Sequence, residues 1–185
     1  MLFRSDPSQG ITLTSAGNFN GTDKNDTLTG DGGVNQINAM LGADTITGLA
    51  GADVLTGGGG ADTFRISAFS ESTLAAMDFI TDFNVTQGDK IDVPFTTTSV
   101  FNRGVISATT LQAALQLAFN DKDSATAGSQ PLLINEVVVL QWGTSSLNRN
   151  TYVASPDSDS GNFNGDLVIR LPNITGGTIG VGTFI

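Results

Sequence analysis

The sequence contains no cysteine and no histidine, and only two of its 185 residues are glutamate. It therefore cannot build a disulfide framework, a His/Cys zinc site or a nucleophilic site of the Ser-His-Asp or Cys-His kind. Lysine and arginine number 8 against 18 acidic residues, for a net charge of −10. This balance argues against a nucleic-acid partner. No apolar run approaches the ~20 residues of a membrane span, and the opening MLFRSDP lacks a signal-peptide core.

The carboxylates are unevenly chosen, since 16 of the 18 acidic residues are aspartate. Aspartate and glutamate carry the same charge, so solubility alone would not select between them. A need for short carboxylates in tight turns would, and the chain also has 23 glycines. The apolar fraction of 39% supports a packed core, and only 14% of the residues are charged.

Residues 21–65 form five consecutive rows of nine, which we call repeats 1 to 5: GTDKNDTLT, GDGGVNQIN, AMLGADTIT, GLAGADVLT and GGGGADTFR. Positions one and four are mostly glycine. Position six holds Asp26, Asn35, Asp44, Asp53 and Asp62. Position eight holds Leu28, Ile37, Ile46, Leu55 and Phe64. A flexible Gly/Asp/Thr-rich linker would not keep an apolar residue in one column over five periods, so the pattern indicates a repeat structure.

The pattern predicts a turn over the first six positions of each repeat and a three-residue strand over the last three. If two repeats make one coil, the turns of repeats 1, 3 and 5 share one edge and those of repeats 2 and 4 share the other. Stacked position-six carboxylates would then repel one another at roughly 4.8 Å. A calcium ion between adjacent turns removes this repulsion, because calcium accepts 6 to 8 carboxylate and carbonyl oxygens. Magnesium fits less well, since it demands strict octahedral geometry.

The rows resemble the GGxGxDxUx nonapeptide of RTX (haemolysin-type) calcium-binding proteins, in which U is apolar. The resemblance implies a right-handed parallel β-roll with about three or more Ca²⁺ ions between turns, held by position-six side chains and turn carbonyls. Carbonyl candidates at positions one and three are Gly21, Asp23, Gly30, Gly32, Ala39, Leu41, Gly48, Ala50, Gly57 and Gly59. Three departures matter. Asn35 supplies no charge, Lys24 places a cation in the first turn, and Ala39-Met40-Leu41 replaces the glycines that open the other repeats.

The segment 78–93, DFITDFNVTQGDKIDV, resembles the one that follows the last repeat in secreted RTX proteases. Asp78 and Asp89 precede apolar residues at the spacing seen between positions six and eight. We expect two further coils that cap the roll, with Asp78 and Asp89 as ligands facing repeats 4 and 5. Carboxylates in ordinary turns or helix N-caps are the alternative.

The expected fold is all-β with one short helix. We expect a lead-in over 1–20, complete or truncated, then the roll over 21–65, a capping segment over 66–108, and a helix plus β-rich secretion region over 109–185. The helix is predicted over 109–120, and strands over 136–142, 151–154 and 166–171. The acidic loop 155–161 is either one more calcium loop or an exposed hairpin. The last six residues, GVGTFI, resemble a weakly structured type I secretion signal.

These features favour a secreted calcium-binding module rather than an enzyme, because the sequence has neither HExxH nor G-x-S-x-G. Its expected partners are calcium and, through the C-terminal region, the ABC transporter of a type I secretion system. Two alternatives stay open. The chain could be the tail of a larger RTX protease, lipase or epimerase, since only twenty residues precede the repeats. It could also bind ice, carbohydrate or another surface through the Thr-x-Thr pairs at 27/29 and 45/47.

Overall fold

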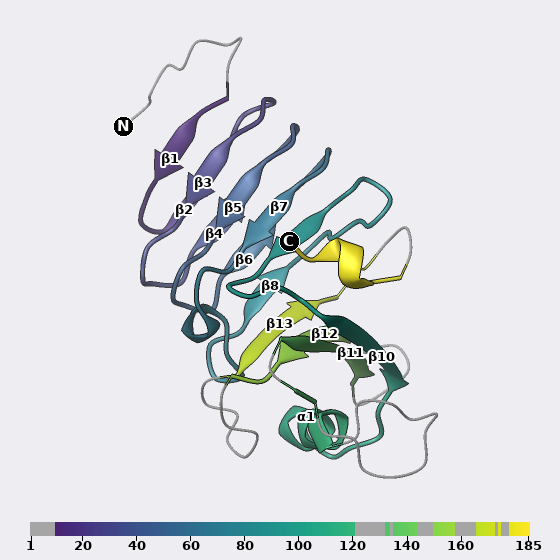
Figure 1. The fold of residues 1–185 in the computed structure, drawn as a ribbon. Helices are drawn as coiled ribbons and strands as arrows, with labels where there is room; N and C mark the ends of the chain where they lie inside the picture. Colours follow the sequence, from purple (N-terminus) through teal and green to yellow (C-terminus); the bar gives the residue numbers. More distant parts are fainter. Residues whose placement is uncertain are drawn as a thin grey trace.

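The computed structural model describes residues 10–120, 132–133, 135–143, 150–157, 166–172, 174 and 178–185. It is built mostly of β-strands, with one short α-helix at one end (Figure 1). The strands form two sheets. The first contains β1 (Thr12–Thr14), β3 (Thr27–Thr29), β5 (Thr45–Thr47), β7 (Thr63–Arg65) and β9 (Lys90–Asp92). The second contains β2 (Asn18–Asn20), β4 (Gln36–Asn38), β6 (Val54–Thr56), β8 (Asp78–Ile80), β13 (Leu167–Leu171), β12 (Asn150–Ser155), β11 (Glu136–Trp142) and β10 (Ser99–Val105).

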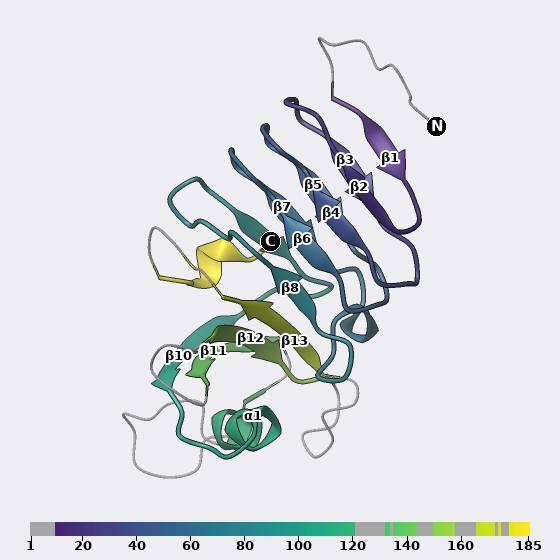
Figure 2. The ribbon, with the colours of Figure 1, turned by 180° about the vertical axis from the view of Figure 1, so that it is seen from behind.

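The chain alternates between the two sheets from β1 to β9, and all strand pairs within this part are parallel. Each coil therefore consists of two strands and two turns, as Figures 1 and 2 show from opposite sides. The register is 18 residues, with Leu28 opposite Ile46 and Ile37 opposite Leu55. This arrangement confirms the predicted parallel β-roll with two repeats in each coil.

Position eight supplies the core of the roll. Leu28, Ile37, Ile46, Leu55 and Phe64 are all fully buried. Ile80 and Ile91 continue the two columns beyond the repeats and are equally buried. A three-residue strand buries too little surface to be stable by itself, so the stack as a whole holds each strand in place.

The paired strands begin at Thr12, before the boundary predicted at Gly21. Leu13 lies opposite Leu28 and Phe19 opposite Ile37, and both are partly buried against the core. The nonapeptide pattern does not show this coil, because β1 and β2 are joined by the short turn Ser15–Gly17 and the first register step is 15 residues rather than 18.

The segment after the repeats adds two more strands, as predicted. β8 continues the second sheet beside β6, and β9 continues the first sheet beside β7. A longer connection with the 3₁₀-helix Phe69–Glu71 precedes β8. Both strands lengthen the parallel stack.

The C-terminal region is joined to the roll through a shared sheet, since β13 pairs in parallel with β8. Helix α1 (Leu111–Asn120) packs against β11, with Ala114, Leu115, Ala118 and Phe119 buried. The Thr110 hydroxyl accepts the amide N–H of Ala113 at 3.1 Å, which confirms the predicted N-cap. Strand β10 was not predicted, because Gly104, with φ of 64°, interrupts its apolar pattern with a bulge.

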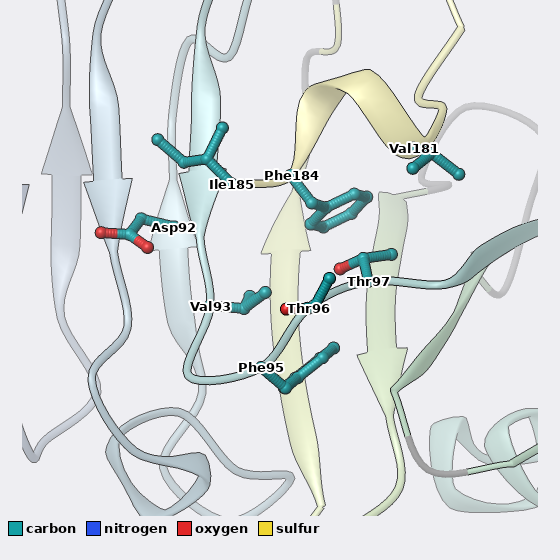
Figure 3. Close-up of a pocket in the computed structure, with 8 residues that line it drawn as sticks. All are labelled: Asp92, Val93, Phe95, Thr96, Thr97, Val181, Phe184 and Ile185. Atoms are coloured by element: carbon teal, nitrogen blue, oxygen red, sulfur yellow. The ribbon is translucent and has the colours of Figure 1, made fainter.

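The last residues do not form a loose tail, and that prediction is wrong for 178–185. Phe184 forms a parallel bridge with Ile91, and the amide of Ile185 donates to the Ile91 carbonyl at 3.1 Å. The Lys90 ammonium donates to the carbonyl of Gly182. A pocket of about 520 Å³ lies between this tail and residues 92–97, with Val93 and Phe184 among its lining residues (Figure 3). The tail therefore covers the exposed edge of β9.

Candidate metal centre

The position-six side chains form a ladder along each edge of the roll. In each step, Oδ1 of one aspartate accepts the backbone N–H of the position-six residue one coil earlier. On the first edge the ladder joins Asp26 to Asp44 at 2.7 Å, Asp44 to Asp62 at 3.0 Å and Asp62 to Asp89 at 3.0 Å. On the second edge it joins Asn35 to Asp53 at 2.7 Å and Asp53 to Asp78 at 3.0 Å. The structure thus brings together all seven side chains that the sequence suggested.

These carboxylates are buried, with none more than 4% exposed. Four of them leave their second oxygen, Oδ2, without a hydrogen-bond partner: Asp44, Asp53, Asp62 and Asp78. A buried acceptor without a donor loses its hydration and receives nothing in return, and a buried charge loses far more. The turns therefore need a cation or protons.

The same burial raises the pKa values of these groups. It raises the pKa of Asp44 to about 7, of Asp53 and Asp62 to about 6, and of Asp78 to about 8. Backbone N–H groups lower each value in part, while neighbouring carboxylates raise it further. The pKa of Asp89 is also raised, chiefly by burial. Near neutral pH the metal-free turns therefore bind protons readily.

Oxygen atoms from two successive turns surround the glycine at position one. A Cβ on Gly21 would lie 2.5 Å from Oδ2 of Asp26 and 2.7 Å from the Ala39 carbonyl oxygen. A Cβ on Gly30 would lie 2.5 Å from the Gly48 carbonyl oxygen and would also meet Oδ1 of Asn35. Only a residue without a side chain leaves this oxygen-lined space open.

The carbonyls that approach the neighbouring turn belong to positions one and four. A Cβ on Gly42 would lie 2.5 Å from the Lys24 carbonyl oxygen, and a Cβ on Gly51 would lie 2.5 Å from that of Gly33. The position-four carbonyls were absent from the predicted ligands. At position three, the Gly59 carbonyl already accepts the N–H of Gly42 at 2.8 Å. The other position-three carbonyls, those of Asp23, Gly32, Leu41 and Ala50, stay predicted ligands.

Two of the three departures in the repeats have a different outcome from the one expected. The Lys24 side chain is exposed, so it places no cation within the first turn. Repeat 3 keeps the turn geometry of its successors despite its side chains: Met40 has φ of 80°, against 69° for Leu49 and 93° for Gly58. At position four, φ is 132° for Gly42, 135° for Gly51 and 136° for Gly60.

Two further carboxylates lie near the ladder and were not predicted. Asp82 accepts the N–H groups of Gly57 and Gly58 at 3.0 and 2.7 Å, and its charge helps to raise the pKa of Asp62. Glu71 is buried, and its charge helps to raise the pKa values of Asp53 and Asp78. Asp82 stands in the quoted DFITDF segment, but Glu71 lies in the long connection that interrupts the period, which gave no signal for it.

Within the described ranges, no three His, Cys, Asp or Glu side chains converge as in a metal site made of side chains alone. A cation here would rely on carbonyl oxygens as well, and these are the ligands that calcium accepts together with carboxylates. The residues therefore fit calcium, which would supply the positive charge that the buried carboxylates lack. The loop 155–161, the other calcium candidate, lies largely outside the described residues. No helix among the described residues is long and apolar enough to cross a bilayer.

Comparison with known proteins agrees with this geometry. The family model for the RTX calcium-binding nonapeptide repeat (4 copies) matches residues 15–46 and 40–65. No curated protein matches the chain. Two solution structures from Azotobacter vinelandii are similar in fold. The AlgE6R2 subunit of a mannuronan C5-epimerase has 27% identity and a TM-score of 0.52 over 97% of this chain and 96% of its own. The AlgE6R3 subunit has 22% identity and a TM-score of 0.53 over 92% and 77%. Residues 15–65 of this chain are therefore RTX calcium-binding nonapeptide repeats.

Proposed function

We propose that the chain is a calcium-triggered folding module of a secreted protein, with no catalytic site of its own. In this proposal it leaves the cell unfolded through a type I secretion system that recognises the C-terminal region. It folds outside, where calcium fills the turns. Extracellular calcium modules have dissociation constants of about 10⁻⁴ to 10⁻³ M, so cytosolic calcium would leave the turns empty.

The observation that carries the proposal is the set of four buried carboxylate oxygens without partners, on Asp44, Asp53, Asp62 and Asp78. Folding without metal would bury their charges beside one another at neutral pH, and the short strands offer little compensation. Calcium binds only the folded arrangement, because the carbonyls and carboxylates converge only there. Each site adds about 2.7 kcal/mol when the calcium concentration is 100 times its dissociation constant.

Circular dichroism in excess EGTA and in 5–10 mM calcium (roughly the range needed for such sites) tests the proposal. We expect a spectrum with little β-structure in EGTA and a β-rich spectrum after calcium is added, with the change reversed by chelation. Magnesium at equal concentration is the control and should not restore the spectrum. A spectrum that stays the same in EGTA and in calcium would refute calcium-triggered folding.

The similarity to subunits of a mannuronan C5-epimerase favours one alternative, in which the chain is the tail of a larger enzyme. The cited subunits are repeat modules, and this chain covers most of each. In that case a catalytic domain would be encoded upstream. Genomic sequence extending 5′ of the codon for Met1 decides this, since an open frame with a catalytic motif would establish the enzyme and a stop codon would exclude it.

The outer face of the first sheet favours a second alternative, a surface-binding function. Strand β1 adds Thr12 and Thr14 to the predicted ladder, in register with Thr27 and Thr29. The ladder continues to Thr45 and Thr47 on β5, as listed in the register of β3 with β5. It breaks at β7, where Arg65 pairs with Asp92. A thermal hysteresis assay tests the ice-binding version, and freezing behaviour equal to that of a non-binding protein would exclude it.

A further inference from the structure

The turns of repeats 1 and 2 differ from those of repeats 3 to 5 in where the position-six side chain finds its partners. In repeat 1, Oδ2 of Asp26 accepts the Thr22 amide at 2.5 Å, and Oδ1 accepts the Thr22 hydroxyl at 3.0 Å and the Ile11 amide at 2.6 Å. In repeat 2, Oδ1 of Asn35 accepts the Asp31 amide at 2.9 Å. Both side chains are thus satisfied within their own turn.

The position-six aspartates of repeats 3, 4 and 5 have no such partner for Oδ2. In repeats 4 and 5 this oxygen lies against the glycine at position one of the same turn, Gly48 or Gly57. It is therefore buried and directed into the turn, where the carbonyls of the next coil approach. Asp78, one coil beyond repeat 4, also has an unpartnered Oδ2.

Position two explains the difference. In repeats 3 to 5 it is Met40, Leu49 or Gly58, each with positive φ. In repeats 1 and 2 it is Thr22 or Asp31, whose side-chain oxygen accepts the N–H at position four, from Lys24 at 3.2 Å or Gly33 at 2.9 Å. This local turn holds the position-two amide toward the position-six side chain. In repeats 3 to 5 no polar side chain at position two can form that turn.

We propose that calcium occupies three turn pairs only: repeat 3 with repeat 5, repeat 4 with the Asp78 coil, and repeat 5 with the Asp89 coil. The turns of repeats 1 and 2 close on themselves and hold none. This inference rests on the proposed calcium dependence and assigns the ions within it. The conventional pairing would place two ions at repeats 1/3 and 2/4, while the structure moves them to the C-terminal end of the roll.

The nearby unpredicted carboxylates agree with this assignment. Glu71 lies within electrostatic range of Asp53 and Asp78. Asp82 lies within range of Asp62 and Asp89. The negative charge is therefore concentrated at the downstream pairs. At the repeat 2/4 pair, by contrast, position six of the first turn is the uncharged Asn35.

Native mass spectrometry of the full chain, titrated with calcium, counts the bound ions. We expect three for the wild type. The double substitution Thr22→Gly and Lys24→Gly removes the local turn and gives repeat 1 the glycines that repeat 5 has at positions two and four. It should raise the count to four. Asp23→Gly, which adds a glycine at position three of the same turn, is the matched control and should leave three.

A loss-of-site pair completes the test. Asp26→Asn should keep three ions, because asparagine can accept the position-two amide as Asn35 does. Asp62→Asn should lose at least one, because Asp62 serves two of the proposed pairs. If Asp62→Asn fails to fold, the gain of an ion in the double variant still decides the matter.

Five ions on the wild type, loss of an ion in Asp26→Asn, or an unchanged count in the double variant would each overturn the inference. In these cases calcium-triggered folding could still hold, provided that circular dichroism shows it. A wild-type chain that binds no calcium at all would overturn both.

Discussion

The two ends of the roll share one core but satisfy their turns by different means. Leu28 and Ile37 in repeats 1 and 2 are as deeply buried as Leu55 and Phe64 in repeats 4 and 5. Their turns, however, are closed by side-chain hydrogen bonds, while the later turns leave buried oxygens open. The comparison teaches that the apolar column and the metal site are separable features of one repeat. A coil can stack without contributing a calcium site.

The largest expected effect comes from truncating position six on the second edge. Asp53→Ala removes an open carboxylate and leaves the Asn35 amide, its partner at 2.7 Å, without an acceptor. We expect the calcium concentration at the folding midpoint to rise at least tenfold, which corresponds to about 1.4 kcal/mol or more. A calcium titration followed by circular dichroism measures this midpoint.

The matched control is Asn35→Ala on the same edge, one coil earlier. It removes the acceptor for the Asp31 amide and the donor to the Gly17 carbonyl, at a cost of about 1 kcal/mol. Since no ion is assigned to this turn, urea unfolding should show the same loss at all saturating calcium concentrations. Equal shifts of the calcium midpoint in both variants would remove the distinction between the two kinds of turn.

Acidification should separate the two kinds of turn in a second way. The folded-state pKa values of Asp44, Asp53, Asp62 and Asp78 lie above the ordinary value of 3.8. A raised pKa favours the folded state below the ordinary value, and this contribution is lost as the pH rises through about 6 to 8. Each unit of difference is worth about 1.4 kcal/mol. In EGTA, the protein should therefore be more folded near pH 5 than near pH 8.

With calcium present the pH dependence should reverse, because protons and calcium compete for the same carboxylates. The calcium midpoint is expected to rise as the pH falls from 8 to 5. Thermal unfolding at both pH values, with EGTA and with calcium, measures the four stabilities. If acid weakened the metal-free protein, the open carboxylates could not be protonated in the folded state, and the contrast with the closed turns would lose its basis.

The repeat made much of this fold predictable. The position-eight column, the alternation between two sheets and the placement of Asp78 and Asp89 beyond the last repeat all follow from a period of nine. The period could not reveal β1, because its turn is three residues shorter than the others. It could not reveal Glu71, which lies in an irregular connection. It also gave no sign that Thr22 and Asp31 close their turns, because that depends on side-chain hydrogen bonds rather than on periodicity.

Glycine at position two should have opposite effects at the two ends, and this is the smallest of the expected effects. Met40 is 41% exposed and has φ of 80°, a conformation that costs a residue with a side chain about 1–2 kcal/mol. Met40→Gly should relieve part of that strain and stabilise the calcium-loaded protein by about 0.5–1 kcal/mol. Asp31→Gly in repeat 2 should destabilise it by about 1 kcal/mol, because Asp31 accepts the Gly33 amide and the Asn35 side-chain N–H. Urea unfolding of both variants in saturating calcium gives the two signs directly. Stabilisation by both substitutions would mean that repeat 2 favours the open turn of its successors, and that its closure by Asp31 contributes nothing to the folded state.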